Sequence, residues 1–258
     1  MKRALPNTIM ITGASGGIGS ALAEAYAAPD KILMLTGRNA QRLDAIVNLC
    51  QQKGARVYAQ AFDITDNGLL AKWLTQMMAV NPIDLVIANA GLSSTLNQQG
   101  QLESLHITNE ISNVNINSVI NTVHPLIEHM LKAKNGQVAI MSSLAALRGL
   151  PHSPAYCASK AAIKTYGESL RALFKQDGIY VSVICPGFVK SAMSDKLVGP
   201  KPFLITATKA AEIIKNKLEK RRPEIIFPSL LNVGIKILNI LPNHFADKLL
   251  MKIKTYAQ

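Results

Sequence analysis

The sequence predicts an α/β protein built on a doubly wound parallel sheet of about seven strands, with helices on both faces. Short runs rich in Ile and Val alternate along the chain with segments of helical periodicity. The runs are apolar on both sides, which is typical of strands buried inside a parallel sheet. Because crossovers between parallel strands are right-handed, the intervening helices cover both faces of the sheet.

The expected elements follow one another in a regular order. We predict strands, some with the turn that follows, at residues 8–15, 31–38, 56–65, 82–91, 137–143, 179–187 and 224–229. We predict helices at residues 17–28, 40–53, 66–80, 102–134, 155–174, 208–222, 229–242 and 244–256. Ligands of doubly wound folds bind beyond the carboxyl ends of the strands, so the residues that follow each strand are the candidates for function.

Composition indicates one globular domain over residues 1–258. With 258 residues, 48% of them hydrophobic, the chain can bury one sizeable core. The three cysteines, Cys50, Cys157 and Cys185, are odd in number and far apart, which favours neither disulfides nor a metal site. We find no signal peptide and no apolar run of membrane-spanning length, and therefore expect a cytoplasmic protein.

The net charge of +12 is concentrated at the end of the chain. Residues 190–258 hold 13 Lys and Arg against 5 Asp and Glu, a net charge of +8. No nucleic-acid-binding motif accompanies this charge, so we expect no nucleic-acid partner.

A glycine-rich turn follows the first predicted strand. In TGASGGIG (12–19), Gly13, Gly17 and Gly19 would let the backbone turn tightly and approach a pyrophosphate at a helix N-terminus. The alternative is a plain strand–helix turn, but the position after a first strand in a βαβ pattern favours dinucleotide binding.

The end of the second strand predicts which dinucleotide binds. Residues 36–40 contain no acid that would hold a ribose 2′-hydroxyl, whereas Arg38 could pair with a 2′-phosphate and Arg42 could add a second cation. We therefore predict NADP(H) as the cofactor. The alternative is that Arg38 is a solvated residue at a helix start.

Tyr156 and Lys160 lie one helical turn apart, with small residues between them. Residues at i and i+4 share a helix face, so the phenol and the ammonium can meet over one patch. Taken alone, this spacing favours a surface pair on an amphipathic helix. An ammonium about 4 Å from a phenolate is worth ~4 kcal/mol, so Lys160 could lower the pKa of Tyr156 by roughly three units.

Five motifs in order make the sequence resemble the short-chain dehydrogenase/reductase family, in its single-domain oxidoreductase branch with a Rossmann-like fold. They are the glycine turn, ANAG (88–91), SS (142–143), YxxxK (156–160) and PG (186–187). The resemblance covers residues 8–195. Departures are slight: Ala88, Ser118 and Ser191 stand where Asn, Gly and Thr are commoner.

The resemblance implies functional residues. The catalytic set would be Asn115, Ser143, Tyr156 and Lys160. Tyr156 would act as acid or base with Lys160 beside it, Ser143 would bind the substrate oxygen, and Asn115 would hold a water in a proton relay. The cofactor would be bound by Gly13, Ser15, Gly17, Ile18, Gly19, Arg38, Asp63, Asn89, Ala90, Gly91, Tyr156, Lys160, Pro186, Gly187, Val189 and Ser191.

We therefore expect an NADP(H)-dependent oxidoreductase that acts on a carbonyl or a secondary alcohol, with an apolar substrate and a homo-oligomeric state. Each site residue also has a structural alternative as a cap or a satisfied core group. The rival function is a non-catalytic dinucleotide-binding sensor or scaffold, which would need only the glycine turn and Arg38. A nucleotide-sugar epimerase is a weaker alternative, because it needs more chain after Gly187.

Residues 190–258 would form a substrate loop followed by a basic, apolar helical extension. Four residues of the loop would give an apolar pocket wall: Met193, Leu197, Phe203 and Leu204. The helices over 229–242 and 244–256 carry broad apolar faces fringed by lysine. Three interpretations remain open: packing on the protein's own body or an oligomer partner, peripheral contact of 229–258 with an anionic membrane, or a lid over a lipid-like substrate.

Overall fold

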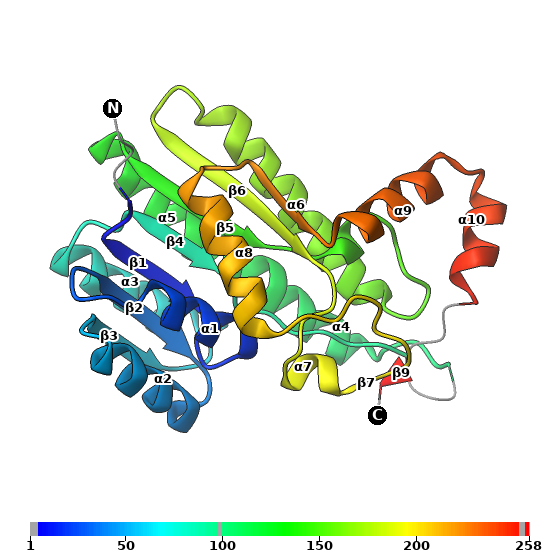
Figure 1. The fold of residues 1–258 in the computed structure, drawn as a ribbon, viewed down its shortest axis with the longest axis horizontal. Helices are drawn as coiled ribbons and strands as arrows, with labels where there is room; N and C mark the ends of the chain where they lie inside the picture. The colour runs from blue at the N-terminus through cyan, green and yellow to red at the C-terminus, as the bar shows by residue number, and fades with distance from the viewer. Residues whose placement is uncertain (1–4, 97–99, 253–255, 258) are drawn as a thin grey trace.

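The computed structural model describes residues 5–96, 100–252 and 256–257, and its centre is a seven-stranded parallel sheet (Figure 1). The strand order is β3-β2-β1-β4-β5-β6-β8. The strands are β1 (Thr8–Thr12), β2 (Ile32–Gly37), β3 (Arg56–Ala61), β4 (Leu85–Ala88), β5 (Gly136–Met141), β6 (Ile179–Pro186) and β8 (Glu224–Phe227). The predicted doubly wound sheet is thus confirmed.

Helices cover both faces of this sheet, and each face has its own apolar cluster. One cluster joins β-strand residues such as Ile9 and Ile11 to α1 (Gly17–Tyr26), α2 (Ala40–Gln52) and α8 (Ala207–Glu219). The other joins the alternate strand residues, such as Met10, to α3 (Asn67–Val80), α5 (Ser118–Ala133) and α6 (Pro154–Leu173). Side chains of successive strand residues point to opposite faces, so a strand that is apolar throughout serves both clusters.

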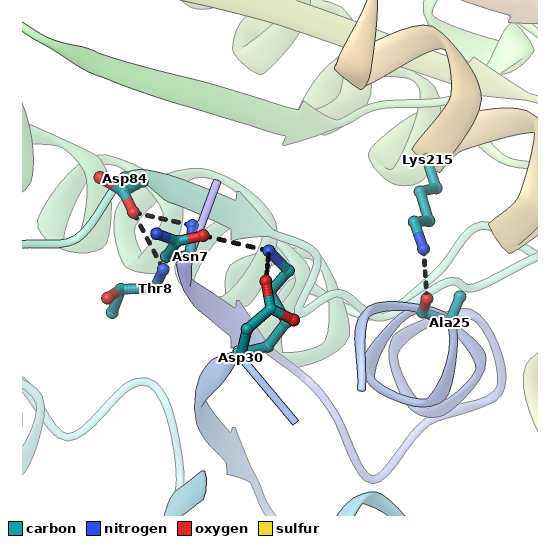
Figure 2. Close-up of polar contacts among 7 residues, drawn as sticks. Asn7, Thr8, Ala25, Asp30, Asp84 and Lys215 are labelled. Atoms are coloured by element: carbon teal, nitrogen blue, oxygen red, sulfur yellow. Dashed lines mark hydrogen bonds and ion pairs between the residues drawn. The ribbon is translucent and has the colours of Figure 1, made fainter. Parts of the chain in front are cut away.

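Polar contacts fix the edge of the sheet at the amino ends of the strands (Figure 2). The Asp84 carboxylate, just before β4, accepts hydrogen bonds from the Asn7 and Thr8 amides at 2.9 Å each, at the start of β1. Lys215 Nζ, on α8, donates to the Ala25 carbonyl of α1 at 2.6 Å. These contacts align β1 with β4 and hold α8 on α1, so the opposite edge of the sheet is left for a site.

The predicted helix over 102–134 is interrupted. It consists of α4 (Leu105–Ser112), the π-helical turn η1 (Asn113–Asn117) and α5. A π turn widens the helix by one residue per turn and is found mainly at functional sites. The predicted third strand is also shorter than expected, because β3 ends at Ala61.

The segment after β6 contains short elements and two helices that stand apart from the sheet. These are α7 (Ala192–Asp195), β7 (Leu197–Val198), α9 (Ser229–Ile240) and α10 (Asn243–Leu250). Figure 1 shows α9 and α10, in orange and red, standing out beyond one side of the body. Among the described residues, we find no helix that is long and apolar enough to cross a membrane.

The predicted helix over 244–256 is wrong at its end. α10 ends at Leu250, and residues 256–257 form β9 (Tyr256–Ala257), which pairs antiparallel with β7. Residues 253–255, which belong to the predicted helix, lie outside the described residues.

Candidate functional site

The candidate site lies where β1, β4, β5 and β6 end side by side. The strand order reverses between β1 and β4, because the chain runs outward to β2 and β3 before it returns to β4. Loops that leave such neighbouring strands in opposite directions open a crevice at the carboxyl edge of the sheet. The residues predicted from the sequence follow these strands.

The glycine turn has a geometry that only small residues allow. Gly13 has a φ of +69°, and a Cβ added at Gly19 would lie 2.2 Å from the Gly13 carbonyl oxygen. A Cβ added at Gly17 would lie 2.8 Å from Cβ of Ser191, so the segment after β6 passes directly over the start of α1. Ile18 is half-buried in the same first turn.

The N-terminus of α1 has no side-chain cap among the described residues. By contrast, α2, α3, α4 and α8 are capped by Asn39, Asp66, Ser104 and Thr206. The first N–H groups of a helix have no partner within the helix, and uncapped they attract an anion. The close glycine backbone and these open donors fit the pyrophosphate of a dinucleotide.

Arg38 follows β2 and is exposed at the same edge of the sheet. Ser15 fills the space beside β2, because a Cβ on Gly37 would lie 2.4 Å from its hydroxyl oxygen. Asp63, predicted near the adenine, comes shortly after the neighbouring strand β3. Hydrogen bonds from the Thr65 amide and hydroxyl, helped by the nearby Arg38 charge, lower the pKa of Asp63.

Asn89 ties the end of β4 to the glycine turn. Its side-chain amide donates to the carbonyls of Thr12 at 3.0 Å and Gly13 at 3.3 Å. The backbone amides of Asn89 and Ala90 donate in turn to the Thr12 hydroxyl, at 3.0 and 3.1 Å. Thr12, which the sequence analysis did not single out, therefore joins two loops of the site.

Asn115 lies in the π turn and is fully buried, with 0% exposure. Its Oδ1 accepts from the Leu92 amide at 2.8 Å, and its Nδ2 donates to the Leu92 carbonyl and to the Ser159 hydroxyl at 2.9 Å each. Both amide hydrogens are thus engaged within the protein. The side chain fastens the segment after β4 to α6, and its predicted contact with a water stays a prediction.

Lys160 places a buried ammonium group at the candidate site. The residue is 4% exposed, and its Nζ donates to the Met141 carbonyl at 2.9 Å. Burial lowers the pKa of Lys160 to about 8. A Cβ on Gly91 would lie 3.2 Å from both Lys160 Nζ and Asn115 Oδ1, so glycine at this position leaves the ammonium room.

Tyr156 and Ser143 complete the group. Lys160 Nζ lies 5.9 Å from the centroid of the Tyr156 ring, so the two side chains share one side of α6. Ser143 caps the short 3₁₀ turn η2 (Leu144–Ala146), where its hydroxyl accepts from the Ala145 amide at 3.1 Å. Its side chain also hydrogen-bonds with that of Tyr156.

The expected lowering of the Tyr156 pKa is wrong for the chain alone. Burial raises the pKa of this phenol, and the hydrogen bond with Ser143 only partly offsets the rise. The physical reason is that a phenolate loses its hydration in this half-buried position. The ammonium that should compensate is directed at the Met141 carbonyl. Tyr156 is therefore a protonated donor at neutral pH.

Two serines beside the predicted residues were given no role in the sequence analysis, although Ser142 belongs to the SS motif. The Ser142 hydroxyl donates to the Lys160 carbonyl, and the Ser159 hydroxyl donates to the Tyr156 carbonyl, both at 2.8 Å. Both bonds fix α6 at its first turns. For Ser142 the signal in the sequence was the SS motif, and for Ser159 it was its place between Tyr156 and Lys160.

The segment after β6 forms the far wall of the crevice. Pro186 ends β6, and the Gly187 amide donates to the Phe227 carbonyl at 2.7 Å. Val189 is buried and bridges to Ile205, and Ser191 caps α7. The predicted apolar wall further on stays a prediction, because Met193, Phe203 and Leu204 are exposed.

A hollow of about 630 Å³ lies between η2, the start of α6 and α10. Most of its lining is apolar, including Ala146, Leu150 and Leu250. Ala145 and Cys157, which lie close in sequence to Ser143 and Tyr156, also line it. The hollow therefore adjoins the candidate site, although Ser143, Tyr156 and Lys160 are not among its lining residues.

Comparison with known proteins shows the family and the fold. Residues 7–201 match the family model of the short chain dehydrogenases, and the chain belongs to this family of oxidoreductases, whose fold binds a nicotinamide dinucleotide. An uncharacterized oxidoreductase of Myxococcus xanthus is 32% identical over 93% of this chain and 94% of its own length.

Solved structures share the fold at lower identity. A short chain dehydrogenase/reductase of Burkholderia phymatum in complex with NAD superposes with a TM-score of 0.81, at 21% identity, over 90% of this chain and 92% of that one. A short-chain dehydrogenase of Sphingobium yanoikuyae in complex with NADPH gives 0.77, at 20% identity, over 92% and 96%. The family resemblance seen in the sequence is confirmed.

Proposed function

We propose that this chain is an NADP(H)-dependent oxidoreductase that interconverts a carbonyl compound and the corresponding alcohol. The observation that carries the proposal is the meeting of Ser143, Tyr156 and Lys160 at the carboxyl edge of the sheet, beside the uncapped start of α1. A phenol, a hydroxyl and an ammonium beside a dinucleotide cradle are the groups that carbonyl reduction needs.

Each residue has a role that its position supports. Ser143 donates a hydrogen bond to the carbonyl oxygen of the substrate and orients it. Tyr156, protonated at neutral pH because its pKa is raised, gives its proton to the same oxygen during reduction. Lys160, charged below about pH 8, stabilises the phenolate that remains. When bound, the dinucleotide supplies the hydride.

Asn115 supports these groups from beneath. It links Leu92 to Ser159, and Ser159 in turn holds the backbone of Tyr156. We propose that it keeps the segment after β4 at the height that the nicotinamide half of the cofactor requires. Pro186, Gly187, Val189 and Ser191 would line the other side of the cofactor.

Arg38 supports the choice of NADP(H) over NAD(H). It is exposed beside Ser15 at the end of β2, where a 2′-phosphate would lie, and its guanidinium can pair with a dianion through two N–H groups. Solved structures of this fold contain NADPH in one case and NAD in another, so the fold does not decide between them. The proposal of NADP(H) therefore rests on Arg38.

The choice of cofactor is tested by measuring the dissociation constants of NADPH and NADH by fluorescence titration. We expect tighter binding of NADPH, and Arg38→Ala should weaken NADPH by about 10–100-fold with little effect on NADH. Lys72→Ala, an exposed cation on α3, is the matched control. Equal or tighter binding of NADH to the unaltered protein would reject NADP(H).

The reaction is tested with a panel of apolar ketones, aldehydes and acyl carbonyls, with NADPH consumption as the readout. We expect turnover of at least one class. Binding of NADPH without turnover of any member, in both directions, would instead support a dinucleotide-binding sensor or scaffold.

A further inference from the structure

Helix α9 is apolar on two opposite sides, and only one of them faces the protein. Leu231, Ile235 and Leu238 are half-buried on the inner side. At about 100° per residue, a second stripe falls on the opposite side of the helix. This stripe is exposed: Leu230 by 63%, Val233 by 51%, Ile237 by 56% and Ile240 by 84%. No residue of α9 is fully buried.

Helix α10 also carries exposed apolar side chains. It buries Ala246 and Leu250, whereas Phe245 and Leu249 are exposed by 55% and 46%. We use "α9–α10 surface" for six exposed apolar residues of both helices: Leu230, Val233, Ile237, Ile240, Phe245 and Leu249. Exposed apolar side chains that gather in this way are typical of a surface that binds another protein or a membrane.

The helix pair is held to the body by polar contacts, so its outer surface is presented in a fixed way. Asn239 Nδ2 donates to the Leu147 carbonyl at 2.9 Å, and Arg148 pairs with Asp247 at 3.0 Å. These contacts reach the loop between Ser143 and α6. The helices are therefore coupled to the edge of the candidate site.

The charges around the α9–α10 surface are of one sign. Lys236, Lys248 and Lys252 are exposed beside it, and no carboxylate in the described part of the chain lies within ion-pair distance of them. The one acid of the two helices, Asp247, is engaged by Arg148.

This charge pattern decides between two occupants. In a two-fold contact between copies of the chain, the same surface meets itself, so the lysines would face lysines. Against a lipid bilayer with anionic headgroups, the lysines are attracted while the apolar side chains enter the boundary of the acyl chains. Because no described helix is both long and apolar enough to span a bilayer, the pair would lie in the plane of the interface.

We propose that the α9–α10 surface docks the protein on an anionic membrane surface. The apolar stripe of α9 and Phe245 and Leu249 of α10 enter the interface, and Lys236, Lys248 and Lys252 contact the headgroups. The contacts through Leu147 and Arg148 place the candidate site close to the membrane, where apolar substrates concentrate.

The test is co-sedimentation of the full chain with lipid vesicles. One set of vesicles contains phosphatidylcholine alone, and the other is an equimolar mixture with phosphatidylserine. The charge variant is Lys236→Gln/Lys248→Gln/Lys252→Gln. The apolar variant is Ile237→Glu/Ile240→Glu, and Leu173→Glu is its control, because Leu173 is equally exposed, at 68%, on the far end of α6. Far-ultraviolet circular dichroism checks that each variant folds.

We expect the unaltered protein and Leu173→Glu to bind the anionic vesicles, with binding reduced by added salt. The triple lysine variant should lose about 100-fold in affinity, and the Ile237→Glu/Ile240→Glu variant should stay in the supernatant. Failure of the unaltered protein to bind anionic vesicles overturns the proposal. So does equal binding by the Ile237→Glu/Ile240→Glu variant. If that variant instead turns a dimer into a monomer in analytical ultracentrifugation and leaves vesicle binding unchanged, the surface docks a second copy.

Discussion

Lys160 is an ammonium group that is almost completely buried, and its burial lowers its pKa to about 8. Its ammonium has lost most of its hydration and donates to the Met141 carbonyl, below Tyr156. The spacing of Tyr156 and Lys160 predicted that the two would meet. It could not predict the pKa of either group, because burial depends on how α6 packs against the strand ends.

The Lys160 pKa predicts a dependence of stability on pH. The pKa is about 8 in the folded chain and near its ordinary value of 10.5 when unfolded, so between these values the unfolded chain binds more protons. The free energy of unfolding should therefore rise from pH 8 to 10.5 because of Lys160, by up to about 3 kcal/mol. Urea unfolding of Lys160→Met should lack this rise relative to the unaltered protein. If the free energy of unfolding depended on pH in the same way in both proteins, the lowered pKa of Lys160 would be contradicted.

Asn115 makes a second prediction at this scale. Asn115→Ala removes three buried hydrogen bonds and leaves both backbone groups of Leu92 without this partner. We expect a loss of about 2–4 kcal/mol in the free energy of unfolding. Asn117→Ala, in the same turn but exposed, should change stability by less than about 0.5 kcal/mol. Similar losses in both variants would show that Asn115 is not the fastening residue.

At the scale of elements, the sequence was most informative where local patterns decide the structure. The strands were located because runs such as residues 9–11 and 32–35 are apolar throughout, and α1 begins where the glycine turn predicts. The π turn was missed because the bonds that hold it, from Asn115 to Leu92 and Ser159, join distant segments. The end of α10 was misplaced because β9 pairs with β7, which no local pattern indicates.

The glycine turn makes a prediction for its element. Gly19→Ala places a methyl group 2.2 Å from the Gly13 carbonyl oxygen, so the turn must open. We expect a loss of about 1–3 kcal/mol in stability and weaker binding of NADPH in titrations. Gly68→Ala, in the first turn of α3, meets Asp66 at an ordinary 3.4 Å and is the matched control. It should be neutral or slightly stabilising. Unchanged NADPH binding in Gly19→Ala would contradict the prediction that the glycine turn binds the cofactor.

At the scale of the whole molecule, the fold class and the edge that carries the site could be predicted, because both follow from strand–helix alternation and the handedness of crossovers. The placement of the C-terminal helices could not. α9 is apolar on both sides, so its composition alone did not say which side would meet the body.

Binding of the dinucleotide should stabilise the whole fold, since its predicted contacts span β1, β2, β4 and β6. At 100 times its dissociation constant, NADPH should add about 2.7 kcal/mol to the free energy of unfolding, which raises Tm by roughly 5–10 °C. Thermal unfolding with NADPH and with NADH at equal concentration measures this. Absence of any shift at saturating NADPH would contradict the predicted cradle.

The central claim is that Tyr156 transfers the proton in a reaction supported by Ser143 and Lys160. The most direct measurement compares the single-turnover rate of carbonyl reduction and the NADPH dissociation constant in Tyr156→Phe and in Tyr166→Phe, a half-buried tyrosine further along the same helix. We predict that Tyr156→Phe loses roughly 10²–10⁴-fold in rate with NADPH binding preserved, and that Tyr166→Phe keeps its rate. Full reduction by Tyr156→Phe would contradict the account.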